Sequence, residues 1–249
     1  MDVVFPQAKE LKNILAATTA FLSEGTFKAK NDGIFLTSLD PANVAIIIVE
    51  MYPNMFLDYK LTEEEEIFTV NLEDLKKIIG KAKVKEQIEW SIDKKKNKLL
   101  VSLKGKSKRT FTLPLIETEG NILEIPSIDL RIKLEMDAKA FSEIISSAKI
   151  IADEIKIVTN PDSNTISFIA EGELKDMKID ITPQDESVLS MEIPAKVTSR
   201  YSVDYLYKVT KVATVSDTVI IKLDQDKPIW LDYRSLDKFK FGFVLAPRE

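Results

Sequence analysis

The segment DLKKIIGKAKVKE, residues 74–86, places five lysines in thirteen residues of a chain whose formal net charge is −5. Ammonium groups gathered in this way can contact the phosphates of a polyanion. Lys77 and Lys81 lie one helical turn apart and opposite an apolar stripe that begins at Leu72, so we expect them to point away from the core. The chemistry indicated by this segment is non-covalent binding of phosphate groups.

Three other segments share this arrangement of lysines opposite an apolar stripe. Together the segments 8–22, 72–85, 137–149 and 202–211 hold eleven lysines and six acidic residues, a net charge of +5, so the rest of the chain carries −10. Such segregation is the electrostatic footprint of nucleic-acid binding, although a charged outer face is also ordinary for any single helix. The outer faces carry no bulky aromatic for stacking on single strands, and no pattern of Arg and Asn that would read base edges.

The chain has no cysteine and no histidine. Disulfides, thiol nucleophiles, the commonest zinc ligands and every His-based triad are therefore excluded. The acidic run TEEEE, 62–66, has no second carboxylate cluster with ligand spacing and is interpreted as a solvated loop. The run KGKSKRT, 104–110, resembles the end of a phosphate-binding loop, but Leu100 stands where that motif needs its first glycine, so we interpret the run as a basic hairpin. We predict no enzymatic activity, no cofactor and no metal site.

Composition predicts a compact protein without a membrane partner. At 249 residues and 45% hydrophobic, the chain can bury one large core or two cores of about 125 residues each. The longest aliphatic run, VAIIIV at 44–49, is too short to span a bilayer, and the start of the chain lacks the pattern of a signal peptide. We expect a cytoplasmic protein.

Helical and strand-like periodicities alternate twice along the chain, and the two halves repeat each other. QAKELKNIL from Gln7 matches DAKAFSEII from Asp137 at an offset of 130, and NLEDLKKI from Asn71 matches SVDYLYKV from Ser202 at an offset of 131. The repeat predicts an α+β fold of two similar domains, each with two strand–helix–strands units. We place the domains at 1–116 and 131–249, joined by a connecting segment at 117–130.

Four apolar stripes with helical spacing identify residues that should face the core. They are Leu11, Ile14, Leu15, Thr18 and Leu22; Leu72, Leu75, Ile79 and Ala82; Phe141, Ile144, Ile145 and Ala148; and Val203, Leu206, Val209 and Ala213. Runs rich in β-branched and aromatic residues between the stripes predict strands, among them 33–39 and 87–93.

The motif DGIFLTSLDPANVAIIIVEM, 32–51, resembles the first-domain signature of the sliding clamp family called proliferating cell nuclear antigen. The helix NLEDLKKIIGKAK, the segment ILEIPSIDL and the ending FVLAPRE resemble the same family, in order along essentially the whole chain. The histidine-free, Lys/Glu/Ile-rich composition is closer to archaeal members. The resemblance implies the DNA-clamp fold in a closed trimeric ring, which encircles duplex DNA and gives processivity to DNA polymerase and other replication and repair enzymes.

Encirclement is the mechanism that the resemblance implies. Helices line the hole of the ring, and weak, screened phosphate contacts let it slide on double-stranded DNA without sequence specificity. The protein would then be associated with the nucleoid. The carried-over DNA-facing residues are Lys9, Lys12, Lys76, Lys77, Lys81, Lys83, Lys85, Lys139, Lys149, Lys208 and Lys211.

A partner pocket is the second site that the resemblance implies. DNA polymerase, flap nuclease, DNA ligase and clamp loader are expected to insert a short motif, one Gln plus aliphatic and aromatic anchors, into an apolar pocket under the connecting segment. Val244 stands where eukaryotic members have an aromatic residue, so we expect a wider pocket floor. The carried-over pocket residues are Leu39, Val44, Ile46, Leu123, Ile125, Pro126, Leu130, Pro228, Val244, Ala246 and Pro247.

A head-to-tail subunit contact is the third implied site. The edge strand at 109–116 would pair with the strand at 174–181 of the neighbouring subunit, which would seal two exposed sheet edges. The neighbour is either a second copy, in a homotrimer, or a paralogue, in a heterotrimer. The interface residues are Arg109, Thr110, Phe111, Thr112, Leu113, Leu174, Lys175, Met177, Ile179 and Ile181.

Two functions of other classes stay open at this point. One is an enzyme of DNA metabolism that works through carboxylates and Mg²⁺, which metal-dependent turnover of DNA would support. The other is a protein-interaction module that forms no ring, which a persistent monomer would favour.

Overall fold

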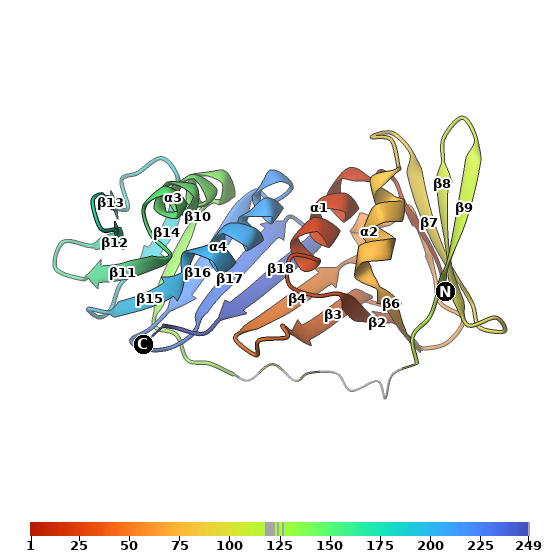
Figure 1. Ribbon diagram of the computed structural model, residues 1–249, viewed down its shortest axis with the longest axis horizontal. Helices are drawn as coiled ribbons and strands as arrows, with labels where there is room; N and C mark the ends of the chain where they lie inside the picture. The colour runs from red at the N-terminus through yellow and green to blue at the C-terminus, as the bar shows by residue number, and fades with distance from the viewer. Residues whose placement is uncertain (118–122, 124, 126, 249) are drawn as a thin grey trace. The chain divides into compact units, whose positions relative to one another are not determined.

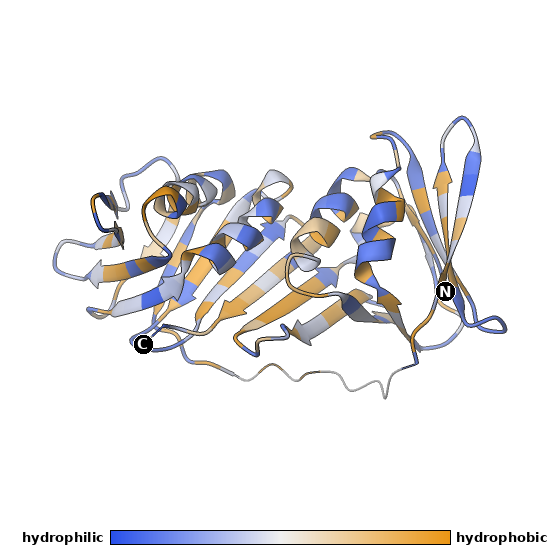
Figure 2. Ribbon diagram, in the orientation of Figure 1, coloured by the Kyte–Doolittle hydropathy of each residue, from blue (hydrophilic) through white to orange (hydrophobic). Residues whose placement is uncertain are grey.

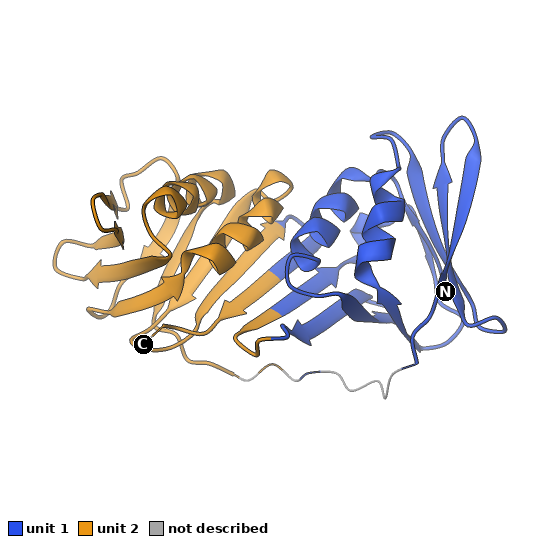
Figure 3. Ribbon diagram, in the orientation of Figure 1, with its two compact units in different colours: residues 1–41, 47–124, 235–241 blue, residues 42–46, 125–234, 242–249 orange. Residues whose placement is uncertain are grey.

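The computed structural model describes residues 1–117, 123, 125 and 127–248 of the chain (Figure 1). The chain divides into two compact units: the first comprises 1–41, 47–124 and 235–241, and the second 42–46, 125–234 and 242–249 (Figure 3). Each unit thus includes a short piece from the other half of the sequence. The connecting segment expected at 117–130 includes positions outside the described residues, so its limits stay a prediction.

The first unit contains two α-helices, one 3-10 turn and strands of two sheets. Its strands are β1 (Asp2–Phe5), β2 (Glu24–Lys30), β3 (Gly33–Leu39), β4 (Ala45–Met51), which enters the unit at Ile47, β5 (Asp58–Lys60), β6 (Glu65–Asn71), β7 (Gln87–Asp93), β8 (Lys98–Lys104) and β9 (Lys108–Pro114). Its helices are α1 (Lys9–Thr18), the 3-10 turn η1 (Pro53–Met55) and α2 (Leu72–Gly80). The strand orders are β5-β1-β7-β8-β9 and β4-β3-β2-β6.

Aromatic side chains fill the core of the first unit. The ring centroids of Phe5 and Trp90 lie 4.9 Å apart and those of Phe27 and Trp90 lie 5.8 Å apart, with the rings steeply inclined to each other. Helices α1 and α2 contact each other and bury their apolar sides, while hydrophilic residues cover their outer sides (Figure 2). The lysines of α1 and α2 are therefore carried on helices that a packed core holds in place.

Helix α2 is shorter than the sequence predicts. Asn71 caps its start by accepting a hydrogen bond from the backbone N–H of Asp74 at 2.9 Å. The segment expected to be helical to residue 85 leaves the helix after Gly80, a poor helix former, and Lys81 is the C-terminal cap. The expectation that Lys83 and Lys85 lie on this helix was wrong, because both lie in the turn that leads to β7. Their assignment as DNA-facing residues stays a prediction.

The second unit has the same kinds of elements. Its strands are β10 (Ile132–Asp137), β11 (Glu154–Asn160), β12 (Thr165–Glu171), β13 (Asp176–Ile181), β14 (Val188–Glu192), β15 (Thr198–Ser202), β16 (Thr218–Leu223), β17 (Ile229–Ser235) and the C-terminal part of β18 (Phe239–Leu245). Its helices are α3 (Ala138–Ile151) and α4 (Val203–Val209), the latter continued by the 3-10 helix η2 (Thr210–Thr214). The strand orders are β13-β12-β11-β15 and β14-β10-β16-β17-β18.

The four predicted apolar stripes are buried, so this part of the sequence prediction is confirmed. The most exposed member, Ile144, has only 6% of its surface accessible. In the second unit Asp137 caps α3 by accepting a hydrogen bond from the backbone N–H of Ala140 at 2.8 Å, and α3 and α4 contact each other. None of the helices in the described ranges has both the length and the apolar character needed to cross a membrane.

Candidate functional site

Two lysines of α2 form ion pairs with acidic residues of the same helix. Lys76 lies 3.4 Å from Glu73 and Lys77 lies 3.1 Å from Asp74, each three residues back along α2. All four side chains are more than 40% exposed, so these ion pairs contribute little to stability. Their carboxylates nevertheless offset part of the positive charge that α2 presents to solvent.

Lys12 of α1 is tied to the end of α2. Its Nζ group donates hydrogen bonds to the backbone carbonyls of Gly80, at 3.2 Å, and Ala82, at 2.5 Å. Carbonyls at the C-terminal end of a helix have no partner within the helix and carry the negative end of its dipole, so a cation is favourable there. Lys12 therefore fixes α1 against α2 while its charge stays at the half-buried surface.

One carboxylate organises the lysines of the second unit. Asp204, in the first turn of α4, lies 2.8 Å from Lys208 and 3.1 Å from Lys149 of α3. Hydrogen bonds from Lys208 and Lys149 hold the pKa of Asp204 below its usual range. The Nζ group of Lys208 also lies 5.6 Å from the ring centroid of Tyr205. This site links α3 to α4 and leaves one positive charge in excess.

Six of the predicted DNA-facing lysines form no ion pair with any other described residue. All six are exposed: Lys9, Lys139 and Lys211 lie on helices, Lys81 caps the end of α2, and Lys83 and Lys85 lie in the turn between α2 and β7. Exposed, uncompensated ammonium groups can contact phosphates without breaking an existing ion pair. The six are Lys9, Lys81, Lys83, Lys85, Lys139 and Lys211.

The two strands predicted to form subunit contacts both lie at sheet edges. β9 ends the order β5-β1-β7-β8-β9 in the first unit, and β13 ends the order β13-β12-β11-β15 in the second. Along both strands half-buried or buried residues alternate with exposed ones, and Leu174, just before β13, is 95% exposed. Arg109 of β9 donates a hydrogen bond at 2.5 Å to the buried carboxylate of Glu86. An edge strand of this kind can accept another strand.

The predicted pocket residues differ in accessibility. Leu39 and Val44 are 37% and 38% exposed, whereas Val244 is only 4% exposed and packs in the core of the isolated chain. Within the second unit the backbone N–H of Ala246 donates to the carbonyl of Val44 at 2.9 Å. Pro126 lies outside the described residues. The remaining members are half-buried: Ile46, Leu123, Ile125, Leu130, Pro228, Ala246 and Pro247.

The acidic run at 62–66 is only in part the solvated loop that the sequence suggested: residues 62–64 are exposed and lie in a loop, whereas β6 begins at Glu65. Glu66 belongs to β6, is 4% exposed, and accepts hydrogen bonds from the backbone N–H and hydroxyl of Thr62 at 2.9 and 2.8 Å. Although burial opposes ionisation, these bonds hold the pKa of Glu66 below its usual range. The carboxylate is used for structure, and the described residues contain no group of three or more acidic side chains placed to hold a metal ion.

The hairpin interpretation of 104–110 is confirmed, because β8 pairs with β9 across a turn at 105–107.

Sequence reasoning missed a polar network in the second unit, where Arg131, Asp224 and Lys227 meet. Arg131 and Asp224 are 93 residues apart, so no spacing in the sequence relates them. The only local signal was that Arg131 directly precedes β10 and Asp224 directly follows β16.

Comparison with known proteins gives consistent matches over the whole chain. The family models for the N-terminal and C-terminal domains of proliferating cell nuclear antigen match residues 1–122 and 124–248. A protein of Nanoarchaeum equitans named DNA polymerase sliding clamp is 44% identical over 248 residues, which cover 100% of this chain and 99% of that one. A protein of the same name from Thermococcus fumicolans is 32% identical, with 99% of this chain and 98% of the relative covered.

Solved structures agree with these matches. The crystal structure of a proliferating cell nuclear antigen from Thermococcus kodakaraensis superposes with a TM-score of 0.91 at 28% identity and covers 99% of both chains. A chain of the PCNA2-PCNA3 complex from Sulfolobus tokodaii also gives a TM-score of 0.91, covering 100% of this chain and 99% of that one. At 24% identity the second match shows a shared fold alone.

Proposed function

The chain belongs to the proliferating cell nuclear antigen family and functions as a DNA polymerase sliding clamp, and from this premise we propose that three copies of it close a ring around duplex DNA. The observation that carries the proposal is the set of exposed lysines on the helices and in the turn after α2 that have no acidic partner among the described residues, in a chain whose overall charge is negative. Such lysines attract phosphates, and the acidic remainder of the chain repels DNA from other surfaces.

Sliding follows from the weakness of the lysine contacts. Exposed ammonium groups on long side chains interact with phosphates through water and counterions, so the contacts exchange readily and do not depend on base sequence. Residence on DNA then comes from encirclement. We assign the eleven predicted lysines to the DNA-facing surface, with Lys9, Lys81, Lys83, Lys85, Lys139 and Lys211 as the strongest contributors, since ion pairs or carbonyl contacts engage the others.

Ring closure is assigned to β9 and β13. One chain offers both edges, so identical copies can join head to tail until the ring closes. This reasoning favours a homotrimer. A mixed ring with paralogues uses the same two edges and is the second candidate.

We propose that the enzymes that work with the clamp bind to a pocket formed by the predicted residues around Leu130, Pro228 and Ala246. Burial of two or three apolar anchors at about 1.5 to 3 kcal/mol each suffices for a micromolar contact once the cost of association is subtracted. We propose that flap nuclease, DNA ligase and clamp loader use the same short motif as the polymerase. The clamp itself then performs no chemical step and needs no cofactor.

The test is the molar mass of the purified chain, measured by light scattering after size exclusion over a dilution series. A homotrimeric clamp gives three times the chain mass of 28.2 kDa. A persistent single-chain mass contradicts self-assembly, and addition of paralogues then decides between a mixed ring and a module that forms no ring. Primer extension on singly primed circular DNA provides the functional readout, since the ring should lengthen the products made by the polymerase in one binding event.

A further inference from the structure

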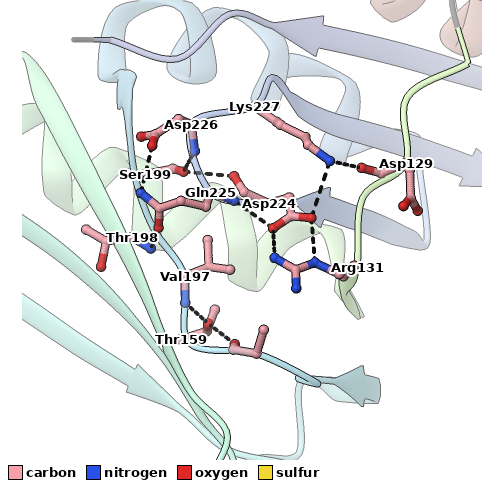
Figure 4. A network of polar contacts seen from close by, with 11 residues as sticks. Asp129, Arg131, Thr159, Val197, Thr198, Ser199, Asp224, Gln225, Asp226 and Lys227 are labelled. Atoms are coloured by element: carbon pink, nitrogen blue, oxygen red, sulfur yellow. Dashed lines mark hydrogen bonds and ion pairs between the residues drawn. The ribbon is translucent and has the colours of Figure 1, made fainter.

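A buried carboxylate joins the start of β10 to the turn after β16. These strands are antiparallel with Ile132 opposite Leu223, so Arg131 and Asp224 are the next opposed positions beyond the ladder. Arg131 donates from Nε to Oδ2 of Asp224 at 2.8 Å and from Nη2 to Oδ1 at 2.7 Å (Figure 4). This two-pronged geometry is the strong form of an Arg–carboxylate pair, and the Asp224 side chain is only 2% exposed.

Lys227 adds a second link between the same two segments. Its Nζ group lies 3.5 Å from Oδ2 of Asp224 and donates a hydrogen bond to the backbone carbonyl of Asp129 at 2.8 Å (Figure 4). The residues on both sides of Leu130 are therefore bound to the turn that leads into Pro228. Leu130 and Pro228 are two of the predicted pocket residues, and they are far apart in the sequence.

The turn itself is firmly held by β15. Ser199 donates from its hydroxyl to the carbonyl of Asp224 at 2.9 Å, and the side-chain oxygen of Gln225 accepts from the backbone N–H of Thr198 at 2.8 Å (Figure 4). The hydroxyl of Tyr201 donates to the carbonyl of Lys227 at 2.8 Å. Two of these hydrogen bonds hold the backbone of the turn, at Asp224 and Lys227, and the third holds the side chain of Gln225, so Arg131 and Lys227 attach the end of the connecting segment to a rigid support.

We propose that Arg131 and Lys227 are positioning residues for the partner pocket: they hold the backbone around Leu130 against the turn at Asp224, and so keep one wall of the pocket ordered before a peptide arrives. The proposal rests on the proposed function of that pocket. A wall that is already ordered spares the peptide the entropy cost of ordering it, which raises affinity without any direct contact from Arg131 or Lys227. The ligand is a peptide with aliphatic and aromatic anchors, the chemistry that Leu130 and Pro228 can accept.

The experiment measures peptide affinity by calorimetry with a synthetic peptide that carries one Gln followed by one aliphatic and two aromatic anchors. Arg131→Gln and Lys227→Met should each weaken peptide binding about ten-fold. Arg131→Lys keeps the positive charge but cannot form the pair of hydrogen bonds to Asp224, so it should bind more tightly than Arg131→Gln and more weakly than the unaltered chain. Lys133→Met is the matched control, since Lys133 lies on β10 and pairs at 3.5 Å with the exposed Glu192 instead of Asp224. The control should change affinity by less than about two-fold.

Hydrogen exchange separates positioning from a general loss of stability. In Arg131→Gln the amides of residues 129–131 should exchange faster, while the ring mass and the exchange of β11 and β12 stay as in the unaltered chain. If Arg131→Gln does not fold, Lys227→Met carries the test, because the Lys227 side chain is 41% exposed and its removal leaves the Arg131 fork in place.

Comparison with Ile125→Ala distinguishes failure of this inference from failure of the pocket assignment. Weak binding by Ile125→Ala together with unchanged binding by Arg131→Gln and Lys227→Met overturns the positioning role and keeps the pocket. Unchanged binding by Ile125→Ala overturns the pocket itself. Equal losses in Lys133→Met and Arg131→Gln also overturn the positioning role, because loss of one positive charge would then explain both.

Discussion

Single lysines on α2 differ in the charge that they can offer to a phosphate. Lys77 lies 3.1 Å from Asp74, whereas Lys81 has no ion pair within the described part of the chain. We expect Lys81→Gln to weaken the binding of duplex DNA more than Lys77→Gln. The double variant should lower the slope of log affinity against log salt by up to about 0.9 for each lost contact, and affinity measured across a salt series checks this.

A lysine outside the helices provides the control for that series. Lys95 is exposed in the turn between β7 and β8 and has no ion pair with another described residue, so Lys95→Gln removes the same charge away from the helices. Its salt slope should match that of the unaltered chain. An unchanged slope in the double variant, with the ring mass intact, would rule out a DNA-facing role for Lys77 and Lys81.

A second prediction concerns the stability that Asp204 contributes at acid pH. Because its pKa is lower in the folded chain than the unfolded value of about 3.9, its ion pairs stabilise the fold above that value. This contribution is lost as the pH falls through the folded pKa. The Tm of the unaltered chain should therefore fall more steeply than that of Asp204→Asn between about pH 5 and pH 3.

Thermal unfolding at several pH values is the measurement. The effect should be modest, because the Asp204 side chain is 46% exposed and solvent screens its interactions. Glu143→Gln is the control, since Glu143 is exposed on α3 and forms no ion pair with another described residue. Parallel curves for the unaltered chain and Asp204→Asn would mean that Asp204 contributes no pH-dependent stability.

Individual helices and strands were the most predictable level of the structure. The strands expected at 33–39 and 87–93 have these bounds as β3 and β7, because alternation of apolar residues is a local signal. The end of α2 was predicted less well. Gly80 weakens the helix, and the carbonyls of Gly80 and Ala82 are bound by Lys12, a contact that no local pattern announces.

The hairpin of β12 and β13 offers a test of assembly. Leu174 is 95% exposed, so Leu174→Asp should leave the isolated fold unaltered. If β13 pairs with β9 of a second copy, Leu174 becomes buried, and a charge there should weaken the ring at least about ten-fold because an unpaired buried charge is costly. Light scattering over a dilution series measures the concentration at which the trimer dissociates.

Leu236→Asp is the matched control for this variant. Leu236 is 82% exposed in the turn between β17 and β18 and is not among the predicted interface residues. Its trimer should dissociate at the same concentration as that of the unaltered chain. Identical dilution curves for both variants would exclude the β13 hairpin from the subunit contact.

Across the whole molecule, the sequence predicted the two-unit α+β organisation and the family, because the internal repeat and the matching motifs extend along the full length. The partner and subunit sites came from resemblance and stay predictions. The polar network at Asp224 was not predictable, since it joins residues 93 positions apart that only the folded strands bring together. Long-range polar contacts are therefore the part of this protein that only a structure supplies.

The two sheet edges have a consequence for how a ring of this chain can come apart. A linear row of such subunits always has one contact fewer than it has chains, so its ends remain unsatisfied. In the proposed ring, the third contact joins the two ends of a row that is already assembled. It therefore forms at high effective concentration and needs no further collision between separate subunits. When one contact of the ring breaks, the three subunits remain joined as a row by the other two contacts. A single gap then admits DNA without separating the subunits. Opening and disassembly are thereby separate events.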